Sequence, residues 1–242
     1  DFYDPDVVLL QAEGGTGHQA GLAHLAGGQD VTEFTSLGDL EELLVGINAS
    51  DPRDRIPPID EPRFEGIEDG NQWLEGREPG VLLEMGGEAR FYPIRILTLH
   101  EIVNDEIGGE PIVITYCPLC YTALAFDARV DGNPLRFGVS GLLRNSDLVM
   151  WDGATQSLWQ QITGEAIVGR LAGTRLRPIA TSLVRWGDFK DTFPQGQVLS
   201  RDTGFGFPYG ANPYVGYSGR AQPFGYFEGE IDPRYAALER VV

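Results

Sequence analysis

From Val81 onward, short apolar runs alternate with polar residues and are separated by turn-forming residues. The stretch VLLEMGGEARFYPI predicts a β-hairpin with Gly86-Gly87 at its turn. Further strands are predicted at PIVITY (111–116), TALAFDARV (122–130), PLRFGVS (134–140), DLVMWD (147–152), SLWQQIT (157–163), AIVG (166–169), TRLRPI (174–179) and QVLS (197–200). Hairpins at this spacing predict an α+β fold that is mainly antiparallel β, with a few short helices around a β core. They argue against a doubly wound parallel sheet.

Three segments have the apolar spacing of short helices. Residues 36–45 begin with a possible capping serine and place four leucines on one face, with Gly46 as a stop. PIRILTLHEIVND (93–105) begins with proline, which is favoured at the first position of a helix. LVRWGDFKDTF (183–193) is amphipathic and is followed by Pro194. We therefore expect a helix in each of these segments.

The chain is predicted to consist of an N-terminal arm and one domain. Residues 1–30 contain a short apolar strand at 7–10 and a Gly-rich connector, and the chain opens on DFYDPDVVLLQ, as a mature or trimmed protein would. Residues 31–242 are predicted to form a single β-rich domain that ends in a tail rich in Gly, Pro and aromatic residues. The arm either forms an edge strand of this domain or adds its strand to the sheet of a neighbouring subunit.

Acidic residues dominate the first half of the chain. Residues 1–110 carry 24 Asp and Glu against 6 Arg, whereas residues 111–242 carry 12 acids and 12 bases. Such a surface excludes nucleic acid as a partner, because binding requires cations that replace counterions. No run of apolar residues is long enough to predict a transmembrane segment. The Gly-rich stretches lack the strand and helix context of phosphate loops, so no nucleotide cofactor is expected.

Both cysteines of the chain, Cys117 and Cys120, lie in the stretch TYCPLCY with the spacing C-x-x-C. This spacing brings two sulfurs to one point, and the pair fits a structural disulfide, a soft-metal site or a redox-active dithiol. A thioredoxin-like site needs a helix directly after the motif, whereas a strand is predicted here. His100 ends a predicted helix and is a candidate third ligand. A Cys2His set suits copper or zinc.

Residues around this motif complete the candidate site. Met150 is a possible extra soft ligand if its strand lies alongside. Glu101 and Asp105 stand at helical spacing beside His100 and are candidates to orient the imidazole from the second shell. Arg144 belongs to a polar loop, together with Ser140, Ser146 and Asp147, and is a further second-shell candidate. His18 and His24 in the arm are expected to be solvated or packed. No nucleophile and base stand in a hydrolase-like context, so the catalytic residues are unknown.

The blocks GGEARFYPIRILTLHEIVND, VITYCPLCYTALAFD, LRFGVSGLLRNSDLVMWD and SLWQQITGEAIVG occur in this order along the chain. In these blocks the sequence resembles the family of domain of unknown function 3179, over roughly residues 35–225. The resemblance assigns the family's histidine to His100 and its two cysteines to Cys117 and Cys120, and it implies no activity. Its members are mostly exported or lipid-anchored, which implies an extracytoplasmic location. The sequence has Tyr121 where the family has a small residue.

Two functions remain open from the sequence. The first is an exported or cell-surface domain whose His–Cys-x-x-Cys site binds copper or zinc, or cycles as a thiol pair. The second is a self-assembling extracellular structural protein, a filament subunit, joined through residues 1–30 by strand addition. Copper or zinc is accordingly the expected cofactor, and a second copy of the chain is the expected partner.

Overall fold

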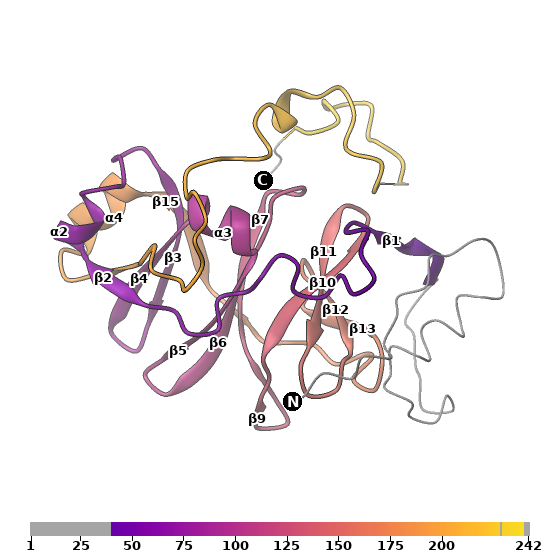
Figure 1. Ribbon diagram of the computed structural model, residues 1–242, viewed down its shortest axis with the longest axis horizontal. Helices are drawn as coiled ribbons and strands as arrows, with labels where there is room; N and C mark the ends of the chain where they lie inside the picture. The colour runs from indigo at the N-terminus through magenta and orange to yellow at the C-terminus, as the bar shows by residue number, and fades with distance from the viewer. Residues whose placement is uncertain (1–39, 228, 240–242) are drawn as a thin grey trace. The chain divides into compact units, whose positions relative to one another are not determined.

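The computed structural model describes residues 40–227 and 229–239 (Figure 1). The predicted arm, with His18 and His24, lies outside these residues. The described chain is mainly antiparallel β, which confirms the predicted α+β class. Its three α-helices are α2 (Ile67–Gly70), α3 (Ile94–His100) and α4 (Trp186–Thr192).

The chain divides into two compact units, and each is built from segments that are distant in the sequence. Among the described residues, the first unit contains residues 40–55, Phe137–Arg175, residues 214–227 and residues 229–239. The second unit contains Ile56–Arg136 and Leu176–Pro213. The single domain over residues 31–242 stays a prediction, because a compact unit defined by contacts need not fold alone.

Two sheets make up most of the second unit. One has the strand order β14-β7-β6-β5, and the other has the order β15-β3-β4-β16-β2. The strands of the first sheet are β5 (Ile102–Ile107), β6 (Glu110–Cys117), β7 (Thr122–Asp127) and β14 (Pro178–Ile179). Those of the second are β2 (Phe64–Gly66), β3 (Pro79–Met85), β4 (Glu88–Pro93), β15 (Thr181–Arg185) and β16 (Gln197–Leu199). A small ribbon of β8 (Arg129–Val130) and β9 (Asn133–Pro134) follows β7. All pairs in the two sheets are antiparallel except β16 with β4.

Alternation along β4 divides the interior of the second unit into two clusters. Tyr92 packs in a cluster with residues of β3, β5, β6 and α3, whereas Phe91, its neighbour in sequence, packs against Trp186 and Phe189 of α4. Successive side chains of a strand point to opposite faces, so this sheet is covered on one face by α3 and the first sheet and on the other by α4. The β6 strand, which ends at the first cysteine, is therefore anchored in the cluster that contains Tyr92.

The hairpin of β3 and β4 confirms the prediction made from its turn. Gly86 and Gly87 both have positive φ, at 61° and 85°, a conformation that glycine adopts without steric cost. The register runs from Met85 opposite Glu88 to Gly80 opposite Pro93. The predicted strands at 111–116 and 122–130 likewise form a hairpin, which carries the two cysteines at its turn.

The predicted helix at 93–105 is wrong in its second half. The α3 helix ends at His100, and Glu101 has φ 60° and ψ −30°, which breaks the helical path. Ile102–Ile107 then pairs with β6 as the strand β5. Apolar spacing alone does not distinguish these outcomes, and the fully buried Ile102 and Val103 gain more from the sheet than from another helical turn.

Two other predicted helices are also shorter than expected. In the stretch 183–193, residues up to Arg185 pair with β3 as an edge strand, and only Trp186–Thr192 is helical. In the stretch 36–45, of which the structure describes residues 40–45, a 3-10 helix covers Leu40–Glu42, while Leu43–Val45 forms strand β1. Sheet pairing overrode helical spacing in both, because each strand gains backbone hydrogen bonds to a longer neighbour.

The described residues of the first unit form a sheet with the order β1-β10-β11-β12-β13. Its further strands are β10 (Phe137–Arg144), β11 (Asp147–Asp152), β12 (Leu158–Gln160) and β13 (Glu165–Val168). The fully buried Asp152 organises the β11–β12 turn, where its carboxylate accepts hydrogen bonds from the amide of Thr155 at 2.6 Å and from Trp159 Nε1 at 3.0 Å. In the tail, the only regular element among the described residues is the 3-10 helix Tyr217–Gly219.

Candidate functional site

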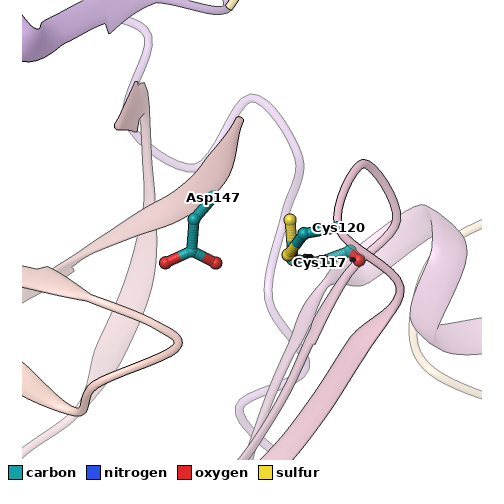
Figure 2. A group of neighbouring side chains, drawn as sticks. All are labelled: Cys117, Cys120 and Asp147. Carbon is teal, nitrogen blue, oxygen red and sulfur yellow. Dashed lines mark hydrogen bonds between the residues drawn. The ribbon is translucent and has the colours of Figure 1, made fainter. Parts of the chain in front are cut away.

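The two cysteines lie at the turn of the β6–β7 hairpin. Cys117 is the last residue of β6 and pairs with Thr122, the first residue of β7, so residues 118–121 form the turn. Tyr121 closes this turn with φ 51°, in the left-handed region that costs a bulky residue steric strain. The tight turn brings both side chains to one place, and Figure 2 shows their sulfurs pointing to the same side.

The sulfurs are close together and are not joined by a disulfide. Their Sγ atoms lie within 4.8 Å of each other. Cys117 is 1% exposed, whereas Cys120 is only partly buried. The hydroxyl of Thr122 lies 2.6 Å from the Sγ of Cys120, so a polar group touches the more accessible thiol. The pair therefore offers two soft donors, of which one can be reached from solvent.

His100 is buried, and protein atoms occupy both of its ring nitrogens. Its Nδ1 lies 2.6 Å from the carbonyl oxygen of Pro57, and its Nε2 lies 2.6 Å from the hydroxyl of Tyr209. A carbonyl oxygen only accepts, so Nδ1 carries the proton. Burial lowers the pKa of His100, while the hydrogen bond to Pro57 opposes this. In the neutral ring, Nε2 then accepts from Tyr209.

The structure does not bring His100 together with the two sulfurs. Within the described residues, no group of three ligand atoms within 4.8 Å of one another includes a histidine. For His100 to reach a shared ion, its side chain would have to leave Tyr209 or Pro57. Coordination by His100 therefore stays a prediction.

Glu101 is the most unusual ionisable residue next to the hairpin. It is 6% exposed, and burial raises the pKa of its carboxyl to about 8. Its backbone carbonyl accepts from the Tyr116 amide at 2.7 Å, but its carboxyl makes no hydrogen bond or ion pair with another residue that the structure describes. Since both nitrogens of His100 bond elsewhere, Glu101 does not orient the imidazole in this conformation.

Asp105, the other predicted partner of His100, belongs to a separate polar cluster. Its carboxylate accepts from Arg90 Nη1 at 2.7 Å and from the Tyr92 hydroxyl at 2.6 Å. Burial, followed by the charge of Asp105, raises the pKa of Tyr92. This cluster ties β5 to β4 and is structural in character.

The remaining predicted site residues belong to the first unit. Arg144 donates to Glu42 at 2.7 Å and to Gln160 at 2.6 Å. Met150 is fully buried in β11, where it pairs with Val139 and Trp159. Asp147, which Figure 2 also draws, begins β11 and accepts from the Ile162 amide at 3.0 Å.

Sequence reasoning missed the residues that surround His100. The hydroxyl of Thr203 hydrogen-bonds to that of Tyr209, and the rings of Phe205, Phe207 and Tyr209 lie 5.2–5.7 Å from the imidazole. These rings belong to the stretch GFGFPYG (204–210), at the start of the Gly-, Pro- and aromatic-rich tail. Nothing in its composition indicated that a histidine about one hundred positions away would lie beneath it.

The comparisons with known proteins give a family and no further relative. The family model described as "Protein of unknown function (DUF3179)" matches residues 53–242. The chain belongs to this family. The match begins later and ends later than the resemblance seen in the sequence, and it contains His100, Cys117 and Cys120. No curated protein and no solved structure matches the chain. Among the described residues, no helix is long and apolar enough to cross a membrane.

Proposed function

We propose that Cys117 and Cys120 bind one soft metal ion, Cu(I), through two thiolates. The observation that carries this proposal is the position of the two sulfurs, within 4.8 Å of each other at the turn of one hairpin and not joined by a disulfide. The partial exposure of Cys120 gives an ion access, and the burial of Cys117 shields the bound ion from water. Each thiol gives up its proton on binding.

The turn supports metal binding better than rapid thiol exchange. Reactive dithiols have their thiol pKa depressed by a helix N-terminus or by neighbouring cations. Here the strand β7 follows Cys120, so no helix begins directly after the motif. A metal ion needs no such assistance, because its own charge stabilises the thiolates.

The donor set favours copper over zinc. Structural Zn(II) sites use four ligands, and catalytic sites use three protein ligands. The described residues of the second unit add no histidine, aspartate or glutamate to the two sulfurs within 4.8 Å. Soft Cu(I) is selected by thiolate ligands and binds with few of them.

Metal content and thiol content together test the proposal. We expect the reduced protein to take up one Cu(I) per chain in competition with a chromophoric Cu(I) chelator, and Cys117→Ser or Cys120→Ser to abolish this uptake. Met85→Leu is the matched control, because it removes a soft sulfur from β3 and should leave the stoichiometry unchanged. Met150→Leu tests the predicted extra ligand.

Two outcomes would count against copper binding. Uptake of one equivalent by the Cys117→Ser/Cys120→Ser double variant would place the ion elsewhere. Native protein that contains neither metal nor titratable thiols would instead have a disulfide at this turn, which elemental analysis and a thiol count would reveal.

We also propose an extracytoplasmic location, which rests on the resemblance to exported proteins. Fractionation of the source cells with an antibody against the chain tests it directly. Recovery of the protein only with the cytoplasmic fraction would refute this location.

Self-assembly through residues 1–30 is proposed from the sequence alone. The apolar run at 7–10, which predicts a strand within an acidic, Gly-rich segment, supports strand addition to another subunit. Deletion of residues 1–30 should then convert an oligomer to a monomer in light-scattering measurements. If the protein remained oligomeric after the deletion, residues 1–30 would not be the segment that joins the subunits.

A further inference from the structure

The threonine that follows the cysteine turn lies against both cysteines. Thr122 is the first residue of β7 and stands directly opposite Cys117 in the ladder of the β6–β7 hairpin. Residues that face each other across an antiparallel ladder point their side chains to the same face. The side chain of Thr122 therefore shares a face with that of Cys117, and its hydroxyl lies 2.6 Å from the Sγ of Cys120.

This face of the hairpin is not the one that packs on α3. Side chains alternate along a strand, so Tyr116 points to the opposite side from Cys117, into the cluster that contains Tyr92 and residues of α3. His100, at the end of α3, keeps its bonds to Pro57 and Tyr209. The polar group that the fold brings to a sulfur within this hairpin is the hydroxyl of Thr122.

The residue between Cys120 and Thr122 makes their contact possible. In an extended strand, residues two positions apart are separated by roughly 6.6 Å along the chain. Tyr121 has φ 51°, so the chain turns sharply between its two neighbours and brings their side chains together. The left-handed backbone strains a residue as bulky as tyrosine, and backbone strain of this kind is typical of functional sites.

The direction of the hydrogen bond between Thr122 and Cys120 depends on whether Cys120 carries a proton. The thiol can donate, and its Sγ also lies 4.0 Å from the carbonyl oxygen of Cys117, which only accepts. A thiolate has no proton and can only accept, so the hydroxyl of Thr122 must then be the donor. A hydrogen bond to the charged form of a group favours that form. Thr122 therefore favours the form of Cys120 that binds a metal ion.

We propose that Thr122 is a positioning residue of the thiol site, whose hydroxyl donates to the Cys120 thiolate and orients it toward Cu(I). This inference rests on the proposed function of Cys117 and Cys120. Because threonine is β-branched, its χ1 angle is restricted and the hydroxyl keeps a defined direction. Hydrogen-bond partners of metal ligands orient those ligands, and their removal typically weakens metal binding by about ten- to a hundredfold.

The variant Thr122→Val tests the proposal, because it removes the hydroxyl and keeps the branched shape of the side chain. We expect its Cu(I) affinity to fall by about tenfold in competition with a chromophoric chelator. Thr122→Ser restores the hydroxyl and should recover most of this loss. Thr181→Val is the matched control, because it removes the hydroxyl of a partly buried threonine from the strand β15 of the same unit, and it should bind Cu(I) as the wild type does.

A second measurement needs no metal ion. In a Cys117→Ala background Cys120 is the one remaining cysteine, and ultraviolet absorbance follows formation of its thiolate during a pH titration. Addition of Thr122→Val should move thiolate formation to higher pH, whereas Thr122→Ser should leave it near its original position. A hydroxyl that only supported the turn would not move this titration.

Three results would overturn the role of Thr122. These are an unchanged Cu(I) affinity in Thr122→Val, a loss of affinity that Thr122→Ser does not repair, and a thiolate titration that Thr122→Val leaves in place. Failure of the proposed function is recognised separately, since the wild-type protein would then bind no Cu(I). The titration in metal-free protein would in that case still decide whether Thr122 stabilises the Cys120 thiolate.

Discussion

The backbone carbonyl of Glu101 accepts a hydrogen bond from the amide of Tyr116 at 2.7 Å. This bond joins the residue that follows α3 to the residue that precedes Cys117. The backbone of Glu101 lies in the left-handed region. Its carboxyl is buried and has no partner among the described residues. A strained backbone and a buried carboxyl with a raised pKa both cost stability, and both are typical of functional sites.

Replacement of Glu101 by glutamine should change how stability depends on pH. Burial raises the pKa of Glu101 from 4.5 to about 8, so the folded state keeps a proton that the unfolded chain loses. This contribution is complete below about pH 4.5 and is lost as the pH rises through about 8. At about pH 8.5, Glu101→Gln should exceed the wild type in free energy of unfolding by roughly 2–4 kcal/mol, since one pKa unit corresponds to about 1.4 kcal/mol.

Urea unfolding at about pH 5, 7 and 8.5 measures this effect. Glu106 is an exposed residue of the strand β5, so Glu106→Gln is the matched control. Its free energy of unfolding should depend on pH as that of the wild type does. If the free energy of unfolding of Glu101→Gln also depended on pH as that of the wild type does, the carboxyl would not be protonated in the folded state.

The left-handed backbone at Glu101 gives a second prediction. Its φ of 60° strains any residue with a Cβ and does not strain glycine. Glu101→Gly should therefore be more stable than Glu101→Ala by about 1 kcal/mol, since both variants remove the carboxyl and differ only in Cβ. Thermal unfolding of the two variants side by side measures the difference. Equal stability, or greater stability of the alanine variant, would mean that the backbone relaxes at this position.

Close packing at Gly80 predicts a clash. A Cβ at this position would lie 2.2 Å from the ring of Phe91, which is itself fully buried beside Trp186. Gly80→Ala should lower the free energy of unfolding by about 1–3 kcal/mol, the usual cost of overpacking. Gly66→Ala is the control, because Gly66 is also in a strand and a Cβ added there would meet no atom within 4 Å. Similar losses for the two variants would contradict the packing argument.

The two thiols should differ in reactivity. Cys120 is partly exposed and Cys117 is 1% exposed. Alkylation requires access to the sulfur, so iodoacetamide should label Cys120 before Cys117 in the reduced, metal-free protein. Peptide mass spectrometry after short exposures follows both sites in one sample. Copper should protect both sulfurs together, and labelling of Cys117 first would contradict the exposure seen in the structure.

The β-hairpins of the second unit were predictable because local chemistry determines them. Gly86-Gly87 supplies positive φ at the β3–β4 turn, and the C-x-x-C stretch joins two clearly apolar strands. Helix boundaries were less predictable. The apolar spacing of 93–105 fits a helix throughout, yet Ile102 and Val103 joined a sheet because β6 offered them hydrogen bonds and burial. Local spacing carries no information about such a partner.

The sequence by itself determined that two thiols stand together, because a spacing of three residues across one turn leaves the sulfurs little room to separate. It also indicated the mainly β fold and the family. Only the tertiary structure decided what His100 does, since its partners Pro57 and Tyr209 lie 43 and 109 positions away. It also decided that Glu101 is buried without a partner among the described residues. Burial and hydrogen bonding between distant segments depend on how the sheets and α3 pack, and the pattern along the chain does not record that packing.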